Sequence, residues 1–236
     1  MLALLSLAGA TWAADLSLAA APDKIAAHHS TWAVYAGGSY AGMAQMDGMA
    51  DKSGGATLVV RFVPPGTDQA AWVEGVSVDA QGRLSKVVHR EGRRLRTTTV
   101  EGAVARDEVR DGGPEGTVID QRELALPEGA LTSPWLLPVL VLDIEAAKGD
   151  AWTGSVLDGA VLSPEPAVLT WQGRSRVGGD RVADLAVFAR AGGAWTLVRA
   201  EGAVAAIQQP GQTQWVQAPR DQVEETHAQA GAARGR

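Results

Sequence analysis

The chain is defined first by the residues that it lacks. None of its 236 residues is cysteine, which excludes disulfide bonds, a thiol nucleophile and cysteine-ligated zinc or iron–sulfur centres. Positive charge is not in excess, since the formal net charge is −6. We therefore expect no nucleic-acid binding, because it depends on a basic surface. The longest apolar run, 134–142, is interrupted by Pro138 and is well short of the ~20 residues of a transmembrane helix, so we expect no integral membrane segment.

The N-terminal segment has the pattern of a signal peptide. Residues 1–14 are uncharged and mostly apolar, and the small residues Thr11 and Ala13 flank Trp12 near the end of the segment. This fits an h-region followed by a cleavage site, although no Lys or Arg precedes the apolar run. We expect a signal peptide over 1–14 and a periplasmic or secreted mature protein. A buried N-terminal helix is the alternative.

Short runs of β-branched and aromatic residues, closed by glycine-containing turns, occupy most of the remaining chain. Such runs, separated by turns of about two to five residues, are typical of an antiparallel meander. The expected strands are 32–42, 57–63, 72–78, 84–90, 95–100, 104–110, 117–126, 152–157, 168–174, 182–190, 195–207 and 214–217.

These strands predict an all-β fold. We expect a single curved antiparallel sheet or open β-barrel of roughly ten strands with one short helix. No linker divides the chain, so residues 31–220 are expected to form a single β domain. Residues 221–236 are polar and rich in Ala and Gly, which predicts a flexible tail or a frayed helix.

The segment from Ser133 to Lys148 interrupts the strand pattern and predicts the short helix. Ser133 can cap a helix and Pro134 suits the first helical position. Gly149 is a suitable stop, and Pro138 requires the helix to be bent. The residues expected on its apolar face, across the sheet, are Trp135, Leu136, Val139 and Leu140.

No catalytic, metal-binding or phosphate-binding pattern is recognisable. The nucleophile elbow Gly-x-Ser-x-Gly is absent. His28 and His29 are adjacent, so in a strand their rings would point to opposite faces and could not share a metal ion. Asp107 and Glu108 are adjacent in the same way, whereas glycoside hydrolysis needs two carboxylates that converge in a cleft. The glycines of 37–42 lack the lysine and helix of a phosphate loop and predict a hairpin turn or a bulge. We expect no cofactor and no metal, and the absence of these patterns favours a non-enzymatic protein while leaving a hydrolase with an unrecognised site open.

Tryptophan is the one abundant aromatic residue, with eight copies against two Phe and two Tyr. Core packing is one explanation for this composition. The other is an aromatic-lined cavity for an apolar or glycan ligand, because tryptophan combines a large apolar area with a polar edge. The candidate ligand-binding residues are the expected helix face and two strand tryptophans, namely Trp135, Leu136, Val139, Leu140, Trp72 and Trp171.

Three segments together carry a resemblance to a protein family. Residues 32–42 read aromatic-x-Val-x-x-x-Gly-x-x-x-Gly, residues 133–150 combine Ser-Pro, a short apolar helix and Gly-Asp, and residues 156–159 end in Asp-Gly. This order resembles a group of exported bacterial β-proteins of unknown function, over about residues 31–209. That group is similar to the half-barrel of the bacterial lipoprotein carriers, in which a curved antiparallel sheet holds acyl chains under a helical lid. The resemblance implies a lipid-like ligand and transfers no catalytic residue.

Three functions are therefore open from the sequence. The first is a non-enzymatic periplasmic binding or carrier protein for an apolar, lipid-like ligand. The second is a structural or envelope-assembly protein whose β core is filled by its own side chains. The third is a hydrolase with an unrecognised site. A Trp-lined cavity would favour the first, a solid interior the second, and convergent carboxylates or a His–Asp pair in a cleft the third. The oligomeric state is not addressed by any of these patterns.

Overall fold

The computed structural model describes residues 21–129, 131–142, 146–178 and 181–234. The expected signal peptide at 1–14 lies outside these residues. Strands account for 60% of the structure and helices for 14%, so the fold is mostly β, as predicted. None of the helices within the described ranges is long and apolar enough to cross a membrane.

All fifteen strands of the described chain belong to one sheet. The first eight are β1 (His29–Ala36), β2 (Ser39–Ala50), β3 (Ala56–Val63), β4 (Trp72–Val78), β5 (Leu84–Glu91), β6 (Arg94–Glu101), β7 (Val104–Asp111) and β8 (Thr117–Ala125). The other seven are β9 (Leu131–Thr132), β10 (Ala151–Asp158), β11 (Val161–Gly178), β12 (Arg181–Arg190), β13 (Gly193–Ala200), β14 (Ala203–Gln209) and β15 (Thr213–Gln217).

The strand order is a meander with one long-range junction. It runs from β8 down to β1, continues from β1 to β15, and then runs down to β9. The strands pair antiparallel, except for the short parallel pair β9–β10. The two edge strands, β8 and β9, follow each other in the chain but lie at opposite ends of the sheet. The prediction of a single open, antiparallel sheet is confirmed in this coarse form.

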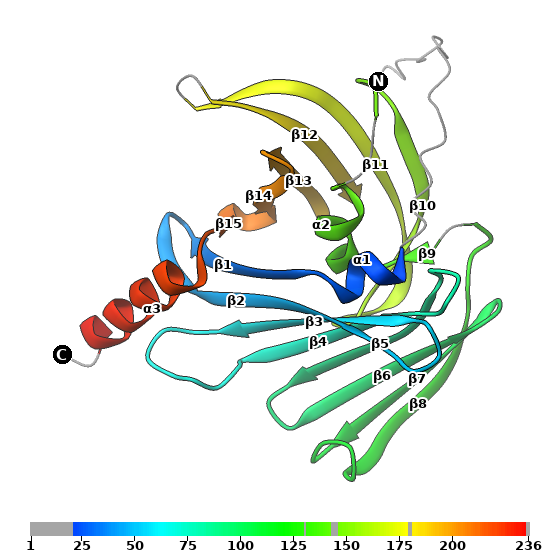
Figure 1. The fold of residues 1–236 in the computed structure, drawn as a ribbon. Coiled ribbons are helices and arrows are strands. Elements are labelled where there is room, and N and C mark those ends of the chain that lie inside the picture. Colours follow the sequence, from blue (N-terminus) through cyan, green and yellow to red (C-terminus); the bar gives the residue numbers. More distant parts are fainter. Residues whose placement is uncertain (1–20, 130, 143–145, 179–180, 235–236) are drawn as a thin grey trace, which may run out of the picture.

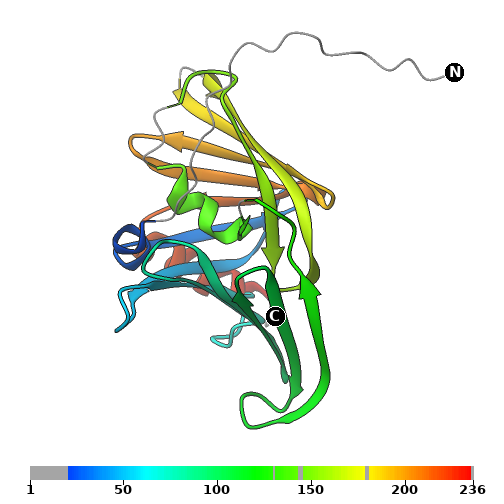
Figure 2. The same ribbon diagram turned by 90° about the vertical axis from the view of Figure 1, so that its right-hand side faces the viewer.

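The sheet bends around a short apolar helical segment (Figure 1). This segment consists of a 3-10 turn, η1 (Pro134–Leu136), followed by α2 (Leu137–Leu140). Strands β10–β14 lie on one side of it and β1–β5 on the other. Strands β6–β8 extend away from the helical segment (Figure 2). The face of the sheet that looks toward η1 and α2 is called the inner face below.

Side chains along each strand alternate between the two faces of the sheet, so every second residue points to the inner face. Its residues pair across strands into continuous rows. The row from β11 to β1 is buried and apolar throughout, and contains Trp171, Ala186, Leu197, Ile207, Trp215 and Val34. These side chains and the apolar residues of η1 and α2 belong to one hydrophobic core.

Two further helices pack against strands β1–β3. α1 (Pro22–Ala26) buries Ile25 in the core. It approaches β2 so closely at Gly48 that a Cβ there would lie 1.7 Å from the carbonyl oxygen of Ile25, so only glycine fits. α3 (Arg220–Arg234) occupies the region for which the composition predicted a flexible tail or frayed helix. It buries Val223 and brings His227 to within 3.2 Å of the Tyr40 hydroxyl.

The prediction of roughly ten strands is wrong, because the sheet has fifteen. The segment 195–207 was expected to be one strand, but Glu201 (φ 54°) and Gly202 (φ 77°) divide it into β13 and β14. Two consecutive positive φ angles are typical of a tight hairpin turn, and Glu-Gly is not among its strongest sequence signals. Within 32–42, Gly37 and Gly38 form an equivalent turn between β1 and β2.

The helix predicted over 133–148 is much shorter than expected. Ser133 does cap it, since its hydroxyl oxygen accepts a hydrogen bond from the Trp135 N–H at 3.4 Å. α2 nevertheless ends at Leu140, with Val141 as its C-cap. Pro138 falls in the first turn of α2, where a missing N–H costs no helical hydrogen bond. Residues 143–145, which the prediction placed in this helix, lie outside the described residues.

Candidate functional site

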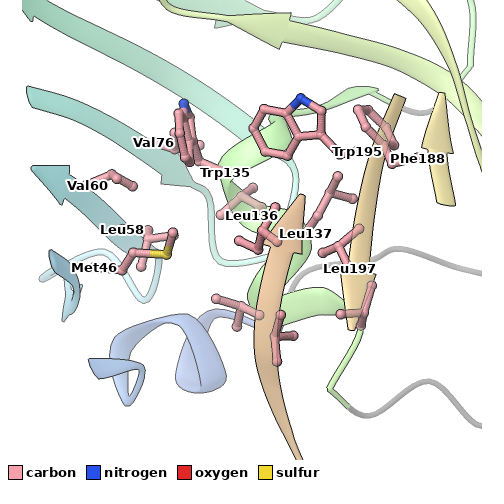
Figure 3. Packing of buried hydrophobic residues seen from close by; sticks show 14 of the residues in the cluster. Met46, Leu58, Val60, Val76, Trp135, Leu136, Leu137, Phe188, Trp195 and Leu197 are labelled. Carbon is pink, nitrogen blue, oxygen red and sulfur yellow. The ribbon is translucent and has the colours of Figure 1, made fainter. Parts of the chain in front are cut away.

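A cluster of four tryptophans lies where η1 meets the inner face. Trp135 of η1 is at the centre, with its ring centroid 5.1 Å from Trp215, 5.2 Å from Trp195 and 5.3 Å from Trp72. The three partners come from β15, β13 and β4, so the cluster joins both halves of the sheet through the helical segment. Figure 3 shows Trp135 and Trp195 facing each other above Leu136 and Leu137.

The position of Trp135 is fixed by interactions at both ends of the helical segment. The Ser133 cap holds the N-terminal end. At the C-terminal end, Nη1 of Arg199 donates hydrogen bonds to the carbonyl oxygens of Val141 and Leu142, both at 3.1 Å. A guanidinium at this end satisfies carbonyl groups that the helix leaves unpaired. Leu136 and Leu137 are fully buried between them, so the segment is anchored to the sheet.

A pocket of about 410 Å³ adjoins the tryptophan cluster, and we call it the Trp pocket. Its apolar wall is formed by Trp72, Trp135 and Trp195. The remaining lining residues are mostly polar and come from β4, β5, the β10–β11 turn, β12 and the segment around 209, namely Glu74, His89, Glu91, Asp158, Ala160, Arg190, Gly192, Gln209 and Pro210. The pocket therefore combines indole surface with charged groups.

The most deeply buried charged residue of the pocket is Glu74, whose side chain is 2% exposed. Its Oε2 lies 3.1 Å from His89 Nδ1, and its Oε1 accepts a hydrogen bond from the Gly159 N–H at 3.1 Å. Burial raises the pKa of Glu74, and the hydrogen bond from His89 opposes that effect. A Cβ at Gly159 would lie 2.8 Å from the His89 Cβ and 2.9 Å from the Glu74 carboxyl. Glycine is therefore required for the β10–β11 turn to reach β4 and β5.

Arg190 forms the second charged group of the pocket. Its Nη1 lies 2.9 Å from Asp158 Oδ2 and 3.7 Å from Glu165 Oε2. Its guanidinium carbon is also 5.8 Å from the centre of the Trp195 ring, in the range of a cation–π contact. Arg190 thus contacts two carboxylates and one indole ring. The side chains of Asp158 and Glu165 are 15% and 20% exposed, and Trp195 is 4% exposed.

The structure brings together only some of the residues predicted from the sequence. Trp135 and Trp72 line the Trp pocket. Leu136 and Val139 are buried in the core, and Leu140 packs against it while partly exposed. Trp171 lies apart from the cluster, with the Arg199 guanidinium 4.6 Å from its ring centre.

Sequence reasoning missed Trp195, Glu74, His89, Asp158 and Arg190 as site residues. They come from strands far apart in the chain, and only the curvature of the whole sheet brings them together. One signal was present: Glu74 shares a strand face with Trp72, Val76 and Val78, and a carboxylate on a face that is otherwise apolar must find a buried partner.

The Trp pocket offers indole rings, carboxylates, a guanidinium and an imidazole. Within the residues that the structure describes, no group of three or more His, Asp or Glu could hold a metal ion. Glu74 and Asp158 are two carboxylates in one pocket, which is the feature expected of a hydrolase. Both oxygens of Glu74 are engaged, however, and Asp158 bonds to Arg190 and to the Ala160 N–H at 3.0 Å. Every oxygen of these two carboxylates therefore has a partner within the protein.

No protein-family model, curated protein or solved structure matches this chain. The fold is that of an all-β protein with a single open, strongly curved meander sheet. The sheet surrounds the short helical segment, and the Trp pocket lies beside that segment.

Proposed function

We propose that this chain is a non-enzymatic binding or carrier protein for a lipid-like, amphipathic ligand, which it holds in the Trp pocket. The observation that carries the proposal is the meeting of Trp72, Trp135 and Trp195 around a pocket of about 410 Å³. The volume falls within the usual range of ligand sites, which combine apolar walls with polar groups that orient the ligand. An apolar chain would lie on the indole rings, and its head group would lie near Glu74, Asp158 and Arg190.

The anchored helical segment supports this proposal. A pocket wall made by Trp135 is useful for recognition only if the ring is held in place, and the Ser133 cap and Arg199 provide this. The apolar segment Met1–Ala14 is consistent with export, so we place this function in the periplasm or outside the cell. N-terminal sequencing of the protein from an envelope fraction tests the location, and an intact Met1 there would contradict it.

Substitution of Trp135 by alanine tests the binding proposal. It removes one wall of the pocket, so the dissociation constant of the neutral dye N-phenylnaphthylamine, measured by its fluorescence, should rise at least tenfold. Unfolding in urea should show a loss of roughly 3–5 kcal/mol, as for other truncations of large core aromatics. Because that loss could unfold the chain, Trp72→Ala is the second variant. Trp72 also lines the pocket but is only partly buried.

Leu137→Ala is the matched control. Leu137 is fully buried in the same helical segment and does not line the pocket. It should lose stability by about 2–5 kcal/mol and keep the affinity for the dye within twofold. Equal affinities in the Trp72, Trp135 and Leu137 variants would contradict a binding role for the Trp pocket.

The second candidate is a structural or envelope-assembly protein. The observation in its favour is the continuous hydrophobic core, in which Leu136 and Leu137 lie between the two halves of the sheet (Figure 3) and Val139 is buried as well. In that case the dye does not bind the unmodified protein at all, and Trp135→Ala affects stability alone. A hydrolase is the third candidate, favoured by Glu74 and Asp158. It predicts that Glu74→Gln abolishes a measurable hydrolysis while leaving dye binding intact.

A further inference from the structure

The charged groups around the Trp pocket do not cancel. Glu74 and Asp158 line it together with Arg190, and Glu165 lies behind Arg190. Three carboxylates thus face the Arg190 guanidinium and the His89 imidazole, and Nη1 of Arg96 lies 3.1 Å from the Ala160 carbonyl oxygen at the edge of the pocket. Ionised carboxylates therefore outnumber the guanidinium groups by one. At the rim, Glu91 and Arg94 are cross-strand partners and contribute charges of opposite sign.

The indole rings add to this preference. The faces of aromatic rings are electron-rich and attract cations, most strongly in tryptophan. Trp72, Trp135 and Trp195 present such rings to one pocket, and the chain already places its own cation, Arg190, over Trp195 at 5.8 Å. A pocket of about 410 Å³ has room for a trialkylammonium or primary ammonium group beside these rings.

The pocket is less suited to an anionic head group, because its basic side chains are paired with carboxylates. The one guanidinium of the pocket has its Nη1 between Asp158 at 2.9 Å and Glu165 at 3.7 Å. A phosphate or carboxylate would have to displace one of these carboxylates or lie beside both. His89 is turned toward Glu74, with its Nδ1 at 3.1 Å from the carboxylate. The two basic side chains of the pocket thus have acidic partners, just as Glu74 and Asp158 have donors of their own, so the sign of the remaining charge and the indole rings decide the preference.

We infer that the Trp pocket recognises a positively charged amine, so that the ligand is an amphiphile with an ammonium head group. This inference rests on the proposed binding function and specifies its ligand class. The ammonium group lies among Trp72, Trp135 and Trp195 with Asp158 as its nearest counter-charge, and the apolar chain leaves the pocket along the indole surface.

The test compares three amphiphiles with the same chain length and different heads: dodecyltrimethylammonium, dodecyl maltoside and dodecanoate. Each is titrated below its critical micelle concentration into the full chain, and binding is followed by the change in tryptophan fluorescence. The ammonium compound should bind at least tenfold more tightly than the neutral one, and the anion more weakly than both.

Attraction to an acidic protein in general must be separated from recognition in the pocket. Asp158→Asn removes one negative charge from the Trp pocket, and Glu123→Gln removes one from β8, where that side chain is 66% exposed. The two variants have the same net charge. The preference for the ammonium head should fall at least fivefold in Asp158→Asn and stay within twofold of the unmodified chain in Glu123→Gln.

A measurement on the unmodified chain covers the case in which Asp158→Asn does not fold. Tetramethylammonium chloride should displace bound N-phenylnaphthylamine at concentrations at which sodium chloride and tert-butanol do not. Equal binding of the three amphiphiles, or tightest binding of dodecanoate, overturns the inference and leaves the binding function standing. If no amphiphile and no dye binds, the proposed function fails and the inference fails with it.

Discussion

The inner face of the sheet has two regions of opposite character. The row through β11–β15 and β1 is apolar and buried, ending with Ile207, Trp215 and Val34. The row through β3–β8 starts in the same way and then changes. Its members, in order across the sheet, are Leu58, Val76, Val87, Thr98, Asp107 and Arg122.

The change occurs where the helical segment no longer covers the sheet (Figure 2). Beyond β5 charged inner residues interact mainly with one another, although Val100 still packs against the core and Arg96 donates a hydrogen bond to the Ala160 carbonyl at 3.1 Å. Asp107 is fully buried, and it accepts a hydrogen bond from Thr98 Oγ1 at 2.9 Å. The Nε atoms of Arg96 and Arg122 lie at 3.4 Å and 3.5 Å from its carboxylate. An uncovered apolar face would be an aggregation site, so polarity on β6–β8 keeps this part of the sheet in contact with water.

The largest expected effect is in the apolar region. Leu58→Ala opens a cavity in a fully enclosed site and should lower the free energy of unfolding by about 2–5 kcal/mol. Arg122→Ala, in the same row on β8, should cost less than about 1 kcal/mol because that side chain is 42% exposed. Urea unfolding of both variants measures the contrast. Similar losses would mean that the two regions do not differ in the way described.

The next effect concerns the charged region. Asp107→Ala removes the shared partner of Arg96 and Arg122. Breaking a fully buried ion pair costs roughly 3–5 kcal/mol. Here the cost should be lower, about 2 kcal/mol, because the arginines are 20% and 42% exposed and can rehydrate. Hydrogen exchange should show faster exchange of the β6–β8 amides and unchanged protection of β13–β15. A uniform increase across the sheet would contradict the separation of the two regions.

The third prediction concerns the contact between the two halves. Gly159→Ala places a methyl group against His89 and Glu74, which should cost about 1–3 kcal/mol as an overpacked site. Gly92→Ala is a control for substitution in a turn, because a Cβ there meets no atom within 4 Å. The φ of Gly92 is 56°, an angle at which alanine is strained. The stability loss in Gly92→Ala therefore measures backbone strain without a steric contact. A smaller loss in Gly159→Ala than in Gly92→Ala would show that the turn adapts to the methyl group.

The smallest effect is a change in the pH dependence of stability. The pKa of Glu74 is raised above its ordinary value of 4.5 by burial. The folded state therefore keeps a proton that the unfolded chain releases, so this residue's contribution is complete below pH 4.5 and decreases as pH rises through the folded-state pKa. Glu74→Gln should lack this decrease. The free energy of unfolding is compared between the variant and the unmodified chain from about pH 4 to pH 8, with Glu123→Gln as control. Parallel curves would refute the raised pKa.

The sequence predicted the apolar region better than the charged one. Alternation and glycine turns were sufficient to locate most strands, and the Ser133-Pro134 pair located the helical segment. The Trp pocket was only half predicted, through Trp72 and Trp135. Its charged residues come from strands whose proximity depends on the curvature of the whole sheet, which no local pattern reports. Asp107 and Glu108 were likewise predicted to point to opposite faces of one strand. That prediction did not identify the partners of Asp107, which are Arg96 on β6 and Arg122 on β8.

The junction between β1 and β15 has a consequence for folding. Antiparallel neighbours elsewhere in the sheet are joined by local turns, whereas Trp32 pairs with Gln217 across nearly the whole chain. The entropic cost of closing a loop grows with its length, roughly as (3/2)RT ln n, so this pairing is the most expensive to initiate. Local hairpins should therefore form before it, and the core that spans β15 and β1 should be completed last. A circular permutant opened between β8 and β9, with α3 and α1 kept in the segment that joins β15 to β1, would shorten the loop that this late step closes and should fold faster than the unpermuted chain.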